Sequence, residues 1–120
     1  MKRILIVDDQ QEILTVLKKL VTQLGYDGTT ADNWTDALQL FEESDYDLVM
    51  LDVHMPGRNG FQVAKEIRTQ KPEQKIVIMT GLDPGTVHQT LQEIEADFNE
   101  MLYKPFRVAQ IQAILQRVFD

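Results

Sequence analysis

The chain has 120 residues, of which 43% are hydrophobic and 26% are charged, and it contains no cysteine. This size and composition indicate one globular domain with its own core, and the lack of cysteine excludes disulfides and thiolate metal sites. The net charge of -7 disfavours direct binding of this domain to nucleic acid. No apolar run reaches the length of a membrane span or a signal-peptide core. We therefore expect a single domain over residues 1–120, in the cytoplasm and without membrane contact.

Strand-like and helix-like segments alternate along the chain. In chain order, the apolar pattern predicts a strand at 4–7, helix 11–24, strand 26–31, helix 34–43, strand 48–51, helix 61–67, strand 76–79, helix 83–94, strand 101–103 and helix 108–119. Gly25 occupies the position of a glycine that ends the first helix. Asp83 followed by Pro84 is typical of a helix N-terminus.

Several of the predicted strands are apolar at every position, for example 4–7 and 76–79. This indicates that both of their faces are covered, as in a parallel sheet with helices on both sides. Right-handed crossovers then predict a doubly wound α/β fold with a five-stranded parallel sheet, or (βα)5.

Polar residues follow four of the predicted strands directly. Asp8 and Asp9 come after the first, Asp52 after the third, Thr80 after the fourth and Lys104 after the fifth. Ligands of open parallel sheets bind beyond the carboxyl ends of the strands. We therefore expect three carboxylates, a hydroxyl and an ammonium group at one edge of the sheet.

Each of these residues also has a purely structural interpretation. Asp9 and Glu12 match a capping box for the first helix, and Asp52 matches a residue that caps a turn with its side chain. Thr80 matches a turn residue at a strand end, and Lys104 an ordinary surface lysine. Capping alone does not explain why all these strand ends share complementary chemistry.

Three nearby carboxylates repel one another unless cations lie among them. Lys104 supplies one positive charge, and a divalent ion would balance the remainder. Oxygen ligands without histidine or cysteine side chains suit Mg²⁺. In such a setting Asp52 can act as a nucleophile that forms an aspartyl phosphate, while Lys104 and Thr80 contact phosphoryl oxygens. The added negative charge can draw Thr80 inward, which would make the domain a switch.

The residues that carry this chemistry match a known family over the whole chain. They are the pair Asp8-Asp9, the stretch DVHMPGRNG at 52–60, which fits D-x-x-M-P-x-x-x-G, the pair Thr80-Gly81 and the run Lys104-Pro105-Phe106. The chain resembles the receiver domains of two-component response regulators, which have a flavodoxin-like fold.

The resemblance implies a role for each matched residue. Asp52 would accept a phosphoryl group from a phosphohistidine of a sensor histidine kinase or a phosphotransfer protein. Asp9, Asp52 and the main-chain carbonyl of His54 would bind Mg²⁺, and Asp8 would act mainly through water. Thr80 with Gly81 would form the switch and, together with Lys104, would bind the phosphoryl group.

The resemblance also implies a cis peptide bond before Pro105. The chain departs from the family at Met101, where a tyrosine or phenylalanine often couples to the threonine; an aromatic residue, Tyr103, stands next to the lysine instead. Met101 or Tyr103 would therefore be the partner of the switch. We expect the His54 side chain to be exposed and to contribute only its carbonyl; the alternative is a side chain that modulates water attack on the aspartyl phosphate.

The favoured function is a phosphoacceptor switch that assists its own Mg²⁺-dependent phosphorylation and controls an output domain or a partner protein, with or without dimerisation on phosphorylation. It is not an enzyme that turns over a substrate. A haloacid-dehalogenase-like phosphatase would need a second carboxylate two residues after the nucleophile, where His54 stands. A flavin-binding module would need a phosphate-binding loop after the first strand, where Asp8 and Asp9 would repel phosphate.

Overall fold

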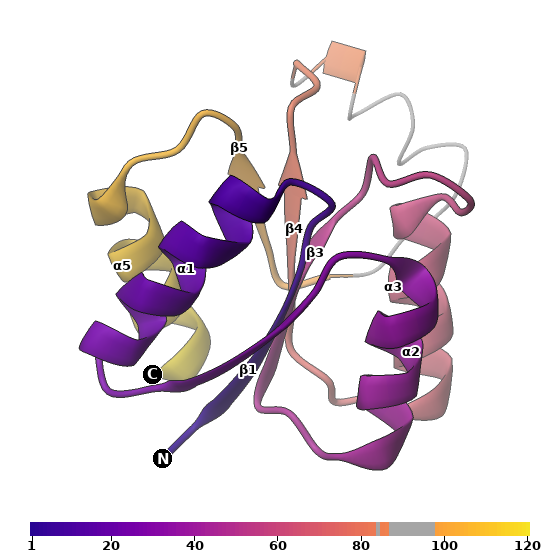
Figure 1. The fold of residues 1–120 in the computed structure, drawn as a ribbon, viewed down its shortest axis with the longest axis horizontal. Helices are drawn as coiled ribbons and strands as arrows, with labels where there is room; N and C mark the ends of the chain where they lie inside the picture. The colour runs from indigo at the N-terminus through magenta and orange to yellow at the C-terminus, as the bar shows by residue number, and fades with distance from the viewer. Residues whose placement is uncertain (84, 87–97) are drawn as a thin grey trace.

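The computed structural model describes residues 1–83, 85–86 and 98–120 (Figure 1). Its strands are β1 (Arg3–Val7), β2 (Asp27–Ala31), β3 (Leu48–Asp52), β4 (Ile76–Thr80) and β5 (Glu100–Tyr103). Its helices are α1 (Gln11–Gln23), α2 (Trp34–Glu43), α3 (Gly60–Gln70) and α5 (Val108–Phe119). All lie where the sequence predicts them, with small shifts at the ends. The helix predicted over 83–94 falls outside the described residues from position 87 onward.

The five strands form one parallel sheet in the order β2-β1-β3-β4-β5. Helices α1 and α5 cover one face of the sheet, and α2 and α3 cover the other (Figure 1). This arrangement confirms the predicted doubly wound α/β fold. Among the described residues, no helix has both the length and the apolar character that a membrane span requires.

The protein has two hydrophobic cores, one on each face of the sheet, because successive side chains of a strand point to opposite faces. Leu5, Val7, Val49, Leu51 and Ile78 join the core under α2 and α3. Ile4, Ile6, Met50, Val77 and Met79 join the core under α1 and α5. Residues of both sets are almost completely buried, which explains why these strands are apolar at every position.

Two of the predicted helix ends can be compared with their capping residues, together with the start of α1. Gly25 lies just beyond α1 with φ of +92°, a conformation that glycine adopts readily. The side chain of Asp83 accepts hydrogen bonds from the backbone N and the hydroxyl of Thr86, at 3.1 and 2.6 Å, as expected of an N-cap. The capping box predicted for Asp9 and Glu12 is wrong: α1 has Gln10 as its N-cap and no side-chain cap.

The loop between β3 and α3 is held by close packing at Gly60, the first residue of α3. The backbone N of Gly60 donates to the carbonyl of Val53 at 3.3 Å. A Cβ atom at position 60 would overlap the backbone of Val53. Val53 and Met55 are themselves buried, at 4% and 5% exposure. The loop that follows Asp52 is therefore fixed on both sides of His54.

We predict that Gly60→Ala lowers the free energy of unfolding by about 1–3 kcal/mol, because the new methyl group forces Val53 to move. Urea unfolding followed by circular dichroism measures the change. The matched control is Gly81→Ala, since a Cβ at Gly81 meets nothing within 4 Å. Equal stability of the two variants would contradict the packing argument.

Candidate functional site

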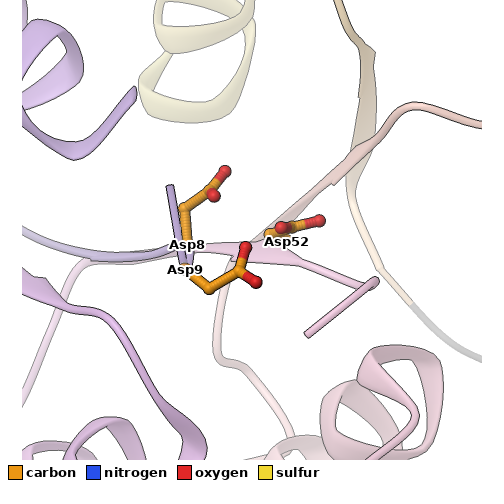
Figure 2. Close-up of side chains that lie close together, drawn as sticks. All are labelled: Asp8, Asp9 and Asp52. Atoms are coloured by element: carbon orange, nitrogen blue, oxygen red, sulfur yellow. The ribbon is translucent and has the colours of Figure 1, made fainter. Parts of the chain in front are cut away.

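Three aspartates converge at the carboxyl edge of the sheet (Figure 2). Strand β1 pairs with β3 so that Val7 lies opposite Leu51, and the next residues on each strand, Asp8 and Asp52, therefore lie side by side. One carboxylate oxygen from each of Asp8, Asp9 and Asp52 falls within 4.8 Å of the others. Asp8 and Asp52 are buried, at 0% and 3% exposure, whereas Asp9 is exposed.

Lys104 provides a positive charge that two of these aspartates share. Its Nζ lies 2.7 Å from Oδ2 of Asp8 and 3.4 Å from Oδ2 of Asp52. It also donates a hydrogen bond to the side-chain oxygen of Gln10 at 3.1 Å. Its position is set by β5, since the backbone N of Lys104 donates to the carbonyl of Thr80 at 2.7 Å. The side chain is only 16% exposed, so the interpretation of Lys104 as an ordinary surface residue is wrong.

Burial raises the pKa of the Asp8 carboxyl above its ordinary value of 3.8. The hydrogen bonds from Lys104 and from the backbone N of Gln10 lower this pKa, and the nearby charge of Asp52 raises it, but loss of hydration is the largest effect. The Asp8 carboxylate is therefore costly to keep charged even with Lys104 beside it.

Asp52 combines a local hydrogen bond with its contact to Lys104. Its Oδ1 accepts from the backbone N of His54 at 3.1 Å, which is the turn contact that its structural interpretation requires. Its Oδ2 faces Lys104. The structural and functional interpretations of Asp52 are thus compatible, because each uses a different oxygen.

Thr80 and His54 are linked through their side chains. The hydroxyl of Thr80 accepts from the backbone N of Leu82 at 3.0 Å and lies 2.9 Å from Nε2 of His54. Thr80 is completely buried. His54 is exposed as a residue, as expected, but its ring is not directed only to solvent, because Nε2 contacts the threonine.

Several of these groups line a cavity of about 690 Å³. The residues that line it are Asp9, Gln10, Ile13, Asp52, His54, Gly81, Lys104, Pro105 and Phe106. The peptide bond between Lys104 and Pro105 is cis. The lining therefore combines carboxylates and an ammonium group with the apolar residues Ile13, Pro105 and Phe106.

The two candidates for a switch partner lie along β5. Met101 packs against the core under α2 and α3. Tyr103 is 36% exposed and is the register partner of Thr80 on the neighbouring strand. Gln10 is a contact of Lys104 that the sequence did not reveal, since its residue type does not distinguish it from other surface glutamines.

Comparison with known proteins identifies relatives over the whole chain. The family model for the response regulator receiver domain matches residues 4–116. The chain is 38% identical over 119 residues to the probable transcriptional regulator ycf27 of Cyanidium caldarium, covering 96% of this chain and 47% of that protein. It is 31% identical over 118 residues to the chemotaxis protein CheY of Thermotoga maritima, covering 98% and 97%. The chain thus spans about half the length of the curated transcriptional regulators that it matches.

Solved structures give the same result. The response regulator TrrA of Thermotoga maritima, crystallised in complex with Mg²⁺ and BeF, has a TM-score of 0.85 and 35% identity, covering 98% of this chain and 99% of that one. The same regulator in complex with histidine kinase ThkA also has a TM-score of 0.85, at 34% identity and 100% coverage of both chains.

We predict that Asp8→Asn raises the free energy of unfolding at pH 7 in the presence of a chelator. The folded protein binds the Asp8 proton more tightly than the unfolded chain does, so the contribution of Asp8 to stability falls as the pH rises from 3.8 through its raised folded pKa. Asparagine has nearly the same shape without the charge.

Urea unfolding at several pH values tests this. The gain from Asp8→Asn should shrink as the pH falls through the raised pKa, because wild-type Asp8 is then protonated too. Asp45→Asn is the control, since the Asp45 side chain is 99% exposed. An Asp8→Asn protein less stable than the wild type at pH 7 would contradict the prediction.

Proposed function

Because this chain belongs to the response regulator receiver family, we propose that its strand-end pocket accepts a phosphoryl group on Asp52. The observation that carries the proposal is the Lys104 ammonium, which lies between two buried carboxylates at the wall of a cavity. A cation held there can neutralise the oxygens of a phosphoryl group on Asp52. Asp9 and Thr80 lie at the same carboxyl edge of the sheet.

The donor set suits Mg²⁺. Asp9, Asp52 and the main-chain carbonyl of His54 would hold the ion, with Asp8 acting mainly through water. Three carboxylates with oxygens within 4.8 Å of one another carry three negative charges, of which Lys104 offsets one. When bound, the ion would neutralise charge on the phosphoryl oxygens. Hard oxygen ligands are the kind that Mg²⁺ prefers.

The reacting groups of the transfer step are the carboxylate of Asp52 and a phosphohistidine donor, and the step also requires Mg²⁺ at the site. A carboxylate oxygen of Asp52 attacks phosphorus and forms an O–P bond. The N–P bond of the donor breaks, and its electron pair goes to the imidazole nitrogen of the donor. Asp52 then carries close to two negative charges instead of one. Lys104 can turn from Asp8 toward the new group, and Thr80 can donate its hydroxyl to it, with Gly81 leaving space beside it.

The partner of this reaction is a sensor histidine kinase or a histidine phosphotransfer protein. Ile13, Pro105 and Phe106 line the same cavity as Asp52 and give such a partner apolar side chains to contact. We further propose a single receiver domain over residues 1–120 in the cytoplasm, which acts as a switch for an output domain or effector protein rather than as an enzyme. We include in this proposal that the domain can form a dimer when it is phosphorylated.

We predict that incubation with Mg²⁺ and a small phosphodonor adds one phosphoryl group to the wild type and none to Asp52→Asn. Intact-mass spectrometry measures the addition, and a chelator should abolish it. Asp45→Asn should behave as the wild type, because it changes a 99% exposed carboxylate that precedes β3, whereas Asp52 ends that strand. Phosphoryl uptake by Asp52→Asn, or steady release of phosphate from many esters, would contradict the proposed function.

We predict that Lys104→Met binds Mg²⁺ more tightly but takes up the phosphoryl group more slowly. Unit charges 4 Å apart interact by about 1 kcal/mol in water and about 4 kcal/mol near a protein surface. Loss of the ammonium should therefore increase Mg²⁺ affinity by about fivefold or more. Isothermal titration calorimetry measures this, with Lys65→Met on the exposed face of α3 as the control. Unchanged Mg²⁺ affinity would place the ion away from Lys104.

A further inference from the structure

The contact between His54 and Thr80 joins the loop after β3 to the end of β4. It spans 26 positions of the chain, with Nε2 of His54 2.9 Å from the hydroxyl oxygen of Thr80. The same residue contacts Asp52, because its backbone N donates to Oδ1 of Asp52 at 3.1 Å. His54 therefore touches both the proposed phosphoacceptor and the proposed switch residue, through different atoms.

His54 lines the cavity, and its ring contacts Thr80, which does not line it. Among the described residues, those that line the cavity include His54 and Gly81 but not Thr80. Thr80 has no exposed surface. For its hydroxyl to bond to a phosphoryl group in the cavity, Thr80 must exchange its contact with the imidazole for one with that group.

The hydroxyl of Thr80 has little bonding capacity left. A hydroxyl has one hydrogen and two lone pairs, and one lone pair already accepts from the backbone N of Leu82. The imidazole takes either the second lone pair or the hydrogen, depending on its tautomer. In both cases the hydrogen bond holds the oxygen in its covered position.

We propose that His54 is a positioning residue that acts as a latch: in the unphosphorylated protein its ring retains the Thr80 hydroxyl, and the phosphoryl group on Asp52 must compete with it. This inference rests on the proposed function of Asp52. Val53 and Met55 are buried on either side of His54, so release occurs by rotation of the exposed side chain rather than by movement of the loop. The hydrogen bond thereby opposes switching, and its strength sets how readily the switch responds.

The test compares the affinities of the wild type and of His54 variants for beryllofluoride, a phosphoryl analogue, in the presence of Mg²⁺. The amide NMR signals of Gly81 and Leu82 report the binding. His54→Ala and His54→Phe both remove the ring nitrogen, and each should bind the analogue roughly two- to tenfold more tightly, the range expected for one lost hydrogen bond. His54→Gln, whose amide can replace the nitrogen, should stay within about twofold of the wild type. Gln62→Ala, an exposed change on α3, is the control.

A double-mutant cycle separates the latch from direct shielding of the aspartyl phosphate against water. In a Thr80→Ala background, His54→Phe should alter analogue affinity by less than about twofold, because the latch has no partner. An effect of His54→Phe that persists without the Thr80 hydroxyl would overturn the latch.

The hydrogen bond can also be measured without any analogue. The imidazole nitrogen chemical shifts of His54 should differ between the wild type and Thr80→Val, and identical shifts would overturn the latch. If the wild type binds the analogue and His54→Ala and His54→Phe bind it with the same affinity, the latch is overturned and the proposed function of Asp52 is not. Failure of the wild type to bind the analogue at all, or equal binding by Asp52→Asn, would overturn the proposed function with it.

Discussion

Two buried carboxylates and one lysine determine the organisation of this edge of the sheet. A charge inside a protein is costly unless a partner compensates it, and Asp8 and Asp52 are both almost completely buried. Lys104 reaches both of them from the end of the outer strand β5, 96 positions after Asp8. The site therefore requires the parallel pairing of β1 with β3, which places the two aspartates side by side. It also requires the position of β5, which places the lysine.

The compensation is incomplete, and this gives the site its chemistry. One ammonium group serves two buried carboxylates, with the exposed Asp9 nearby, and the pKa of Asp8 is raised as a result of burial. Such a site favours a divalent cation and responds to added negative charge. Neither a haloacid-dehalogenase-like phosphatase nor a flavin-binding module accounts for this combination as well as a receiver domain does.

The sequence predicted the fold because the strands are apolar on both faces, which leaves few alternatives for covering them. It predicted the residues at the strand ends for a related reason, since each polar residue follows an apolar run directly. The side-chain directions were harder to predict. Asp9 matched a capping box, yet the N-cap of α1 is Gln10, and the ring of His54 contacts Thr80 rather than only solvent. Those contacts depend on how separate helices, strands and loops pack together. The pattern of apolar and polar residues within one segment does not determine that packing.

The most direct test of the central claim is a crystal structure of this protein with Mg²⁺ and beryllofluoride. We expect the beryllium group on a carboxylate oxygen of Asp52, the ion bound by Asp9, Asp52 and the carbonyl of His54, and Lys104 turned from Asp8 to the fluorine atoms. An adduct on any other residue, or a Lys104 that makes no contact with the bound group, would contradict the account.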